Sequence, residues 1–240
     1  MEKLRQMIFC RRSVRKYLDR SVTEEDKARI LEHFRSTKSL WPDIRVEARI
    51  VASDEVRFYF PWRSPYLLAV YSEEKAGDLE EVGFRLQQTD LFIQSLGLGS
   101  CWLGLGKLRK DAPQVEGLRF VMLLAFGHPD GVSLRTAISQ FNRRGLEDIS
   151  DRRDERLEPA RLAPSSTNSQ PWFFVHGEDV IHVYQTQAGL LRHRMLGEMN
   201  RIDVGVALAH LYVAYPETFR TVQTDAPEVK GYRYVCSFKI

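Results

Sequence analysis

The chain has 240 residues, of which 43% are hydrophobic and 11% aromatic, a composition that fits a globular protein and argues against disorder. Its 35 lysines and arginines outnumber the 32 acidic residues by so little that the formal net charge is only +3. So balanced a charge gives no support for nucleic-acid or membrane-surface binding, and any anion site must be local. The length allows one large domain or two units of about 120 residues each.

No segment has the pattern of a secretion signal or a membrane span. The N-terminal stretch MEKLRQMIFCRRS contains only a short apolar break, and no window reaches the roughly 18 apolar residues that a membrane-spanning helix requires. We therefore expect a cytoplasmic protein that has neither a membrane nor a nucleic acid as its partner.

The three cysteines do not predict a disulfide framework or a metal site. Cys10, Cys101 and Cys236 have no CxxC spacing and no histidines at metal-ligand spacing. Cys101 lies beside Trp102 in an apolar, glycine-rich stretch, which favours a small buried thiol. A reactive cysteine is the alternative, but no activating base is visible in the sequence.

The first half of the chain predicts helices that alternate with strands. After a short first helix and the extended segment RRSVRKY, Thr23 and Asp26 indicate the start of a helix that should run to about Phe34. VEARIVAS and YLLAVYS predict strands, and the spacing of apolar residues from Glu80 to Leu96 predicts a helix that GLGS ends. The continuous apolar run FVMLLAFG predicts a central strand that is buried on both faces.

The second half predicts a hairpin, a helix and a closing strand. WFFVHGEDVIHVYQT has the pattern of a hairpin that turns at Gly177 to Asp179. DVGVALAHLYVA predicts a long apolar helix that opens at Asp203, and the alternating segment YRYVCSFKI predicts a final strand.

Several of these elements repeat along the chain. LEHFR at Leu31–Arg35 resembles LEPAR, which lies 126 residues later, and both lead through a Trp-Pro or Pro-Trp pair into an apolar strand. Glu81-Val-Gly-Phe and Asp203-Val-Gly-Val open the two long helices and lie 122 residues apart. We interpret the chain as two tandem halves, residues 1–140 and 141–240; chance matches between similar elements are the alternative.

The segment from Arg11 to Arg15 gathers three arginines and a serine. This set favours a phosphate, because guanidinium groups donate hydrogen bonds in a fixed fork and remain charged when partly buried. Alternation in an extended segment would place Arg11, Ser13 and Arg15 on one side and Arg12 on the other. The alternative is a solvated basic stretch.

The segment APSSTNSQPW, from Ala163 to Trp172, offers both donors and acceptors. It follows a predicted helix that Pro164 helps to end. Asn and Gln amides can match the carbonyl acceptors and the N–H donor on the imide edge of an isoalloxazine ring, and Trp172 could exclude water. The alternative is a polar loop of turn-forming residues.

Together the two motifs resemble those of the nitroreductase-like family of flavin mononucleotide proteins. GLGSCWLG, LAFGHP and FNRRGLEDI are similar to further motifs of the family and occur in the expected order, so the resemblance covers most of the chain. The last of these makes Arg143 or Arg144 another phosphate contact, although Gly145 stands where proline is usual.

The resemblance implies an α+β nitroreductase-like fold, with mixed or antiparallel sheets flanked by helices and flavin bound at a dimer interface. RRSVRKY and GLGSCWLG occur only in the first half and APSSTNSQPW only in the second, as in the family's subgroup with two fused halves. We therefore expect a monomer that is an intrachain pseudo-dimer with one FMN site. The expected site residues are Arg11, Arg12, Ser13, Arg15, Cys101, Trp102, Leu103, Arg143, Pro164, Ser165, Ser166, Asn168 and Gln170.

The resemblance also implies an FMN-dependent oxidoreductase that transfers electrons from NADH or NADPH to an electron-poor small molecule such as a nitro compound or quinone. One alternative is a flavin-binding redox sensor or cofactor-storage protein with little turnover. Another is an interaction module whose basic segment docks on phosphate-bearing ligands. No acid or base is assigned, because lone histidines such as His128 and His193 are more often structural or surface-exposed.

Overall fold

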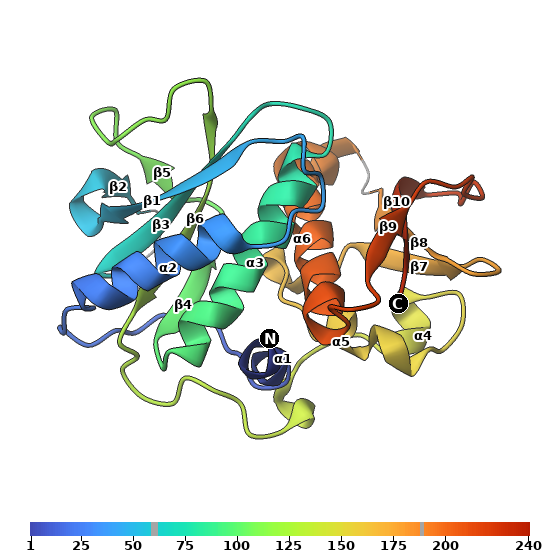
Figure 1. Ribbon diagram of the computed structural model, residues 1–240, viewed down its shortest axis with the longest axis horizontal. Helices are drawn as coiled ribbons and strands as arrows, with labels where there is room; N and C mark the ends of the chain where they lie inside the picture. Colours follow the sequence, from blue (N-terminus) through green and yellow to red (C-terminus); the bar gives the residue numbers. More distant parts are fainter. Residues whose placement is uncertain (59–61, 188–189) are drawn as a thin grey trace.

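Two sheets lie on either side of a central pair of long helices (Figure 1). The computed structural model describes residues 1–58, 62–187 and 190–240, and of residues 190–196 only the backbone. Within these ranges, every strand pairing in the two sheets is antiparallel. The predicted α+β architecture, with antiparallel sheets and flanking helices, is confirmed.

For the described residues, the order of strands in the first sheet is β1 (Val46–Ala52), β3 (Tyr66–Ser72), β6 (Arg119–Gly127) and β4 (Gly99–Leu103). The order in the second is β7 (Trp172–His176), β8 (Ile181–Thr186), β10 (Tyr232–Lys239) and β9 (Arg220–Val222). A small ladder joins β2 (Val56–Arg57) and β5 (Lys107–Leu108). The helices are α1 (Glu2–Ile8), α2 (Glu24–Ser36), α3 (Asp78–Ser95), α4 (Leu146–Ile149), α5 (Glu158–Arg161) and α6 (Leu190–Ala214).

Local sequence signals set many of these boundaries. Thr23 caps α2, because its hydroxyl oxygen accepts a hydrogen bond from the Asp26 amide at 3.1 Å. Gly97 follows α3 with a φ of 80°, in the left-handed region that favours glycine. β6 lies between β3 and β4, and its residues from Met122 to Gly127 are buried, so the predicted central strand is confirmed.

The helix that the sequence predicts to open at Asp203 begins instead at Leu190. Residues 190–202 read LLRHRMLGEMNRI, a stretch without proline and rich in good helix formers, so the helix continues toward the N-terminus. The apolar pattern that starts at Asp203 belongs to the part of α6 that lies in the core. The predicted start was wrong because the buried part of a helix and the whole helix need not begin at the same residue.

The two sheets are connected in the same way. In both, the first two strands along the chain pair with each other, a long helix follows, and the two remaining strands extend the sheet from the second strand. The resulting order is first, second, fourth and third in both sheets when the separate β2–β5 ladder is left out. α3 and α6 each follow the second strand of their sheet, and the two helices cross between the sheets (Figure 1).

Glycines allow α3 and α6 to approach closely. A methyl group on Gly83 would lie 2.0 Å from the carbonyl oxygen of Ile202, and one on Gly205 would lie 2.0 Å from that of Glu80. The two contacts are reciprocal, because Gly205 follows Gly83, and Ile202 follows Glu80, by 122 residues. Any side chain at either glycine would push the helix backbones apart.

The two sheets share one apolar core. The largest cluster of buried side chains includes Phe126 from the first sheet, Phe174 and Phe238 from the second, and residues of both central helices. Residues 1–140 and 141–240 therefore stabilise each other, and the boundary between them stays a prediction. No helix in the described residues is long and apolar enough to span a bilayer.

Candidate functional site

The basic segment RRSVRKY lies along the edge strand β4. Ser13 forms a parallel bridge with Ser100, and the Val14 amide donates a hydrogen bond to the Ser100 carbonyl oxygen at 2.8 Å. A side chain at Gly99 would come within 2.8 Å of the Val14 side chain, so this approach requires glycine. The structure thus brings RRSVRKY against GLGSCWLG.

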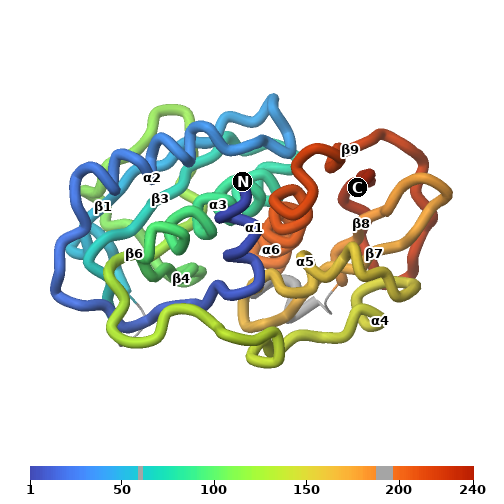
Figure 2. Tube along the Cα trace, turned by 60° about the horizontal axis from the view of Figure 1, so that its bottom comes forward, coloured from blue at the N-terminus to red at the C-terminus, as the bar shows by residue number. Residues whose placement is uncertain are grey.

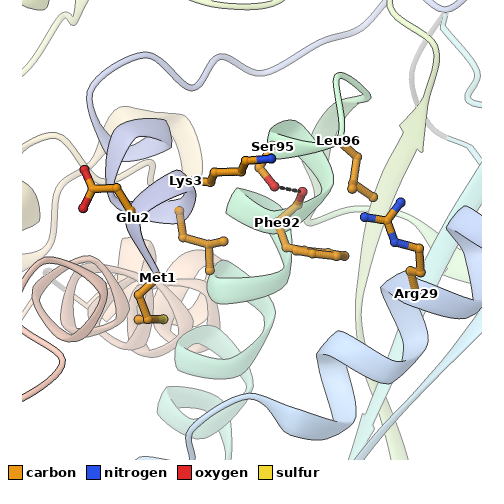
Figure 3. Close-up of a pocket in the computed structure, with 8 residues that line it drawn as sticks. Met1, Glu2, Lys3, Arg29, Phe92, Ser95 and Leu96 are labelled. Carbon is orange, nitrogen blue, oxygen red and sulfur yellow. Dashed lines mark hydrogen bonds between the residues drawn. The ribbon is translucent and has the colours of Figure 1, made fainter.

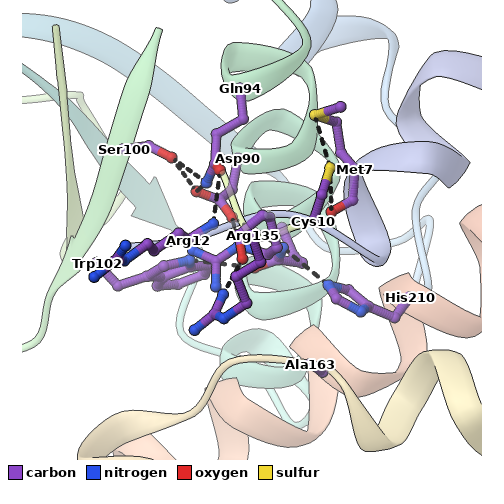
Figure 4. A network of polar contacts seen from close by, with 12 residues as sticks. Met7, Cys10, Arg12, Asp90, Gln94, Ser100, Trp102, Arg135, Ala163 and His210 are labelled. Carbon is purple, nitrogen blue, oxygen red and sulfur yellow. Dashed lines mark hydrogen bonds and ion pairs between the residues drawn. The ribbon is translucent and has the colours of Figure 1, made fainter. Parts of the chain in front are cut away.

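Arg11 is held inside the protein by Asp90 of α3. Its Nε lies 2.9 Å from Asp90 Oδ2, and the two side chains are 1% and 0% exposed. Asp90 also accepts hydrogen bonds from Ser100 Oγ at 2.5 Å and from Gln87 Nε2 at 3.0 Å (Figure 4). Arg11 Nη2, however, is buried without a hydrogen-bond partner in the described part of the chain. An unpaired buried donor of this kind suits an anion.

The other two arginines of the segment face outward. Arg12 and Arg15 are exposed, whereas Ser13 is half-buried and Arg11 is buried. The predicted alternation was therefore wrong, because the segment makes only isolated bridges and no continuous strand imposes a period of two. Within the described residues, neither exposed guanidinium group has an ion-pair partner.

Arg135 adds a cation that no sequence motif indicated. The chain after β6 runs back along the basic segment, and the amide of Arg135 donates to the Cys10 carbonyl oxygen at 2.6 Å (Figure 2). The Arg135 guanidinium donates to the Arg11 carbonyl oxygen and stacks on Phe141 with a distance of 4.2 Å to the ring centroid. The segment around Arg135 reads GVSLRTAIS and carries no recognisable motif, so its place could not be predicted locally.

Arg143 connects this region to the APSSTNSQPW loop. Its Nε donates to the Ala163 carbonyl oxygen at 2.9 Å, and its Nη1 donates to Asn168 Oδ1 at 2.6 Å. The amide of Arg144 donates to Gln170 Oε1 at 2.8 Å. Two motifs that the sequence assigned to opposite ends of a ligand therefore meet directly.

The amide side chains of that loop bind protein groups. Asn168 Nδ2 donates to the Asn142 carbonyl oxygen at 3.0 Å, while Gln170 Nε2 donates to the Asn168 carbonyl oxygen at 3.2 Å. Gln170 is also only 3% exposed. Both amides hold residues 142–144 to the loop, a role that the sequence did not indicate.

The arginines of this region repel one another. Burial, then the charges of Arg11 and Arg12, lowers the pKa of Arg135 to about 10. Burial, followed by Arg11 and Arg135, lowers the pKa of Arg143 to about 10 as well. Asp90 is the carboxylate that pairs with Arg11, so positive charge is in excess. Such a group of guanidiniums favours a multiply charged anion.

A buried histidine closes the inner side of the network. His210 of α6 lies with Nδ1 2.9 Å from the Pro159 carbonyl oxygen and Nε2 3.1 Å from Gln87 Nε2 (Figure 4). Burial, then the charge of Arg11, lowers the pKa of His210 to about 3. His210 is therefore neutral at physiological pH. The side chain of His193 lies outside the described residues, and His128 is half-buried.

The remaining predicted site residues are buried or half-buried. Trp102 is half-buried and donates from Nε1 to Gln87 Oε1 at 3.2 Å, while Leu103 is buried. Cys101 is also buried, and burial raises the pKa of its thiol, as expected for an inert cysteine. Pro164, Ser165 and Ser166 are half-buried directly after α5.

A pocket of about 320 Å³ lies elsewhere, between α1, α2 and α3 (Figure 3). Met1, Leu4 and Phe92 give it apolar walls, and Lys3 and Arg29 add charge at its border. None of the predicted site residues lines it. The described side chains also include no group of three His, Cys, Asp or Glu residues that could hold a metal ion.

Comparisons with known proteins support the family that the sequence motifs resemble. Residues 3–215 match a family model described as "Putative TM nitroreductase". A comparison with curated proteins gave no match. A crystal structure from Thermotoga maritima described as "a putative nitroreductase" is 20% identical, with a TM-score of 0.65 and coverage of 98% of this chain and 91% of that one. A nitroreductase family protein from Clostridium difficile is 16% identical, with a TM-score of 0.50 and coverage of 61% and 95%.

The two structures establish the fold alone at these identities, and they confirm the expected nitroreductase-like fold. The family model goes further, because it spans most of the chain, from α1 through α6. The protein belongs to the nitroreductase family of oxidoreductases.

Proposed function

We propose that this protein is an FMN-dependent oxidoreductase that takes electrons from NADH or NADPH and passes them to an electron-poor small molecule such as a nitro compound or quinone. The observation that carries the proposal is the group of arginines around Arg11. Its positive charges outnumber the carboxylate that pairs with Arg11, that of Asp90, and the group adjoins the APSSTNSQPW loop. Bound FMN would supply the redox chemistry, and the protein would position it and exclude competing reactions.

The arginine group suits the phosphate of FMN. Arg12, Arg135 and Arg143 would donate to it from three separate segments, and Ser13 would add a hydroxyl donor. Arg11 would contribute the Nη2 that lacks a hydrogen-bond partner. A doubly charged phosphate would offset the mutual repulsion that contributes to the low pKa values of Arg135 and Arg143.

The strand β4 and the APSSTNSQPW loop would border the flavin ring. Because Asn168 and Gln170 already bind residues 142–144, they would act mainly by shaping the loop. The Ser166 side chain forms no hydrogen bond within the described residues and offers a hydroxyl to the ring. Trp102, held by its hydrogen bond to α3, would limit the access of water.

We further infer that the chain is a pseudo-dimer of two halves, residues 1–140 and 141–240, which binds one FMN as a monomer. The identical strand order of the two sheets supports this proposal. The reciprocal contacts of Gly83 and Gly205 also support it, since two equivalent units related by an approximate two-fold axis would make them.

Purification and flavin titration test the function. We expect a yellow protein that saturates at one FMN per chain and loses its colour when NADH or NADPH is added without oxygen. A protein that binds FMN but is not reduced by either nucleotide would instead be a sensor or a storage protein. A chain that binds no added FMN would contradict the proposal, and two equivalent FMN sites would contradict the pseudo-dimer.

A further inference from the structure

Each of the two central helices buries a carboxylate that binds the backbone of a distant loop. Asp203 in α6 accepts a hydrogen bond from the Ser166 amide, whose nitrogen lies 3.1 and 3.0 Å from the two carboxyl oxygens. Glu81 in α3 accepts hydrogen bonds from the Leu40 and Trp41 amides at 2.7 and 2.8 Å. Both carboxyl groups therefore fix a loop that precedes the first strand of a sheet.

The two carboxylates occupy equivalent positions. Asp203 follows Glu81 by 122 residues, and Ser166 follows Leu40 by 126, which is also the separation between the first residues of β1 and β7. The loops themselves differ, since the first reads STKSLWPDIRV and the second APSSTNSQPW. The same hydrogen bond thus holds one loop with the flavin motif and one without it.

The loop bound by Asp203 has an unusual backbone. Thr167, Asn168 and Gln170 have φ values of 51°, 57° and 47°, in the left-handed region that residues other than glycine and asparagine seldom adopt. Such a conformation persists only where the surroundings hold it. Asp203 binds the residue just before Thr167, and the Ser169 hydroxyl lies 3.5 Å from Asp203 Oδ2. Asp203 therefore contacts the turn at two residues, Ser166 and Ser169.

We propose that Asp203 is a positioning residue for FMN, which holds the turn from Ser165 to Gln170 in the left-handed form that borders the flavin ring. This inference rests on the FMN-binding function proposed above. Asp203 is 6% exposed and has no ion-pair partner within the described chain, so it acts on the loop and not on the charge of the arginine group. Removing it would free the strained residues to relax and displace the Ser166 hydroxyl.

An uncharged amide at position 203 should accept the same hydrogen bond as the carboxyl group of Asp203. Burial raises the pKa of Asp203 to about 8, so the group is largely protonated at neutral pH. The hydrogen bond to Ser166 needs only one acceptor oxygen, which asparagine retains. Asp203→Asn should therefore keep the anchor that Asp203→Ala removes.

The test compares Asp203→Ala with Glu81→Ala. The second change is matched to the first, because Glu81 anchors the loop that lacks the motif. FMN and riboflavin affinities of the apoprotein are measured at pH 7 by quenching of flavin fluorescence, and Tm is recorded for each variant. We expect Asp203→Ala to lower the affinity for both flavins about tenfold, because the anchored turn borders the flavin ring, which both flavins share. We expect Glu81→Ala to lower Tm but leave both affinities within about twofold, and Asp203→Asn to restore binding.

Equal flavin affinities for wild type and Asp203→Ala would overturn this inference alone, while a wild-type chain that binds no flavin would overturn the proposed function as well. If Asp203→Ala does not fold, Ser166→Pro removes the same hydrogen bond from the other side, with Ser166→Ala as the control for the lost hydroxyl. Ser166→Pro should then bind both flavins about tenfold more weakly than Ser166→Ala. Equal binding by these two variants would overturn the inference.

Discussion

The two central helices take the same place beside their sheets but present different side chains. Asp90 and Gln94 of α3 bind the basic segment directly, and Gln87 donates a hydrogen bond to Asp90. The residues that lie 122 positions later are Ala209 and Tyr212 in α6 and Pro216 just after its end. In α3 these positions hold Arg11, Ser100 and the backbone of Arg12 through ion pairs and hydrogen bonds.

The position in α6 that corresponds to Asp90 holds Tyr212, which packs against aromatic rings. The centroids of Phe84 and Tyr212 lie 5.7 Å apart, and those of Tyr212 and Phe219 lie 6.1 Å apart. Rings packed in this way stabilise the core and offer nothing that could compensate a buried charge. The difference teaches that a repeated architecture can retain its packing around both central helices while only one of them holds the basic segment.

The largest effect should come from the helix crossing that both units share. Gly83→Ala and Gly205→Ala each place a methyl group 2.0 Å from a carbonyl oxygen, so we expect each to lower the free energy of unfolding by about 3 kcal/mol or more. Urea unfolding measures both. Gly131→Ala is the control, because no atom lies within 4 Å of its added methyl group and only its φ of 99° adds strain, about 1 kcal/mol. Clearly unequal losses at Gly83 and Gly205 would break the comparison of the two helices.

The next effect concerns the arginine group, which α3 holds through the ion pair of Asp90 with Arg11. Arg135→Ala removes a guanidinium from the group around Arg11, and we expect FMN affinity to fall about tenfold to a hundredfold. Riboflavin lacks the phosphate and should lose far less affinity. Isothermal titration with both flavins measures the difference, with the surface change Arg20→Ala as the control. Equal losses for the two flavins would show that Arg135 does not act on the phosphate.

A smaller effect concerns the pH dependence of the loop that Asp203 anchors. Burial raises the folded-state pKa of Asp203 from 3.8 to about 8, so its contribution to stability is present in acid and is lost as the pH rises from about 4 through 8. Asp203→Asn removes this titration. The Tm of wild type relative to Asp203→Asn should therefore fall between pH 5 and pH 9. A constant difference over that range would show that Asp203 stays ionised in the folded protein.

The smallest effect is expected away from both loops. Arg29 borders the pocket between the first three helices, forms a surface ion pair with Asp26 at 2.9 Å, and lies apart from the arginine group. Arg29→Ala should leave FMN affinity unchanged within about twofold, since exposed ion pairs contribute little. The same flavin titration checks it. A large loss of FMN affinity would indicate that FMN binds in this pocket and would contradict the site proposed at the arginine group.

Much of the fold follows from local sequence. Thr23 begins a helix through a hydrogen bond to a near neighbour, and Gly97 ends one through its own backbone angles. Both were therefore predictable. The strand β6 was predictable because an apolar run of its length is stable only where both faces are buried. The start of α6 was missed because the residues before Asp203 have helix propensity without the apolar pattern that was read as the helix.

The sequence by itself determined which segments carry groups suited to a phosphate and to a polar ring, because residue type decides which groups can donate, accept or hold charge. Only the tertiary structure decided how those groups are used. It buries Arg11 against Asp90, adds Arg135 from a loop without a motif, and turns Asn168 toward residues 142–144. These outcomes depend on segments that are distant in the chain and meet only when α3 and α6 pack, so no local pattern could specify them.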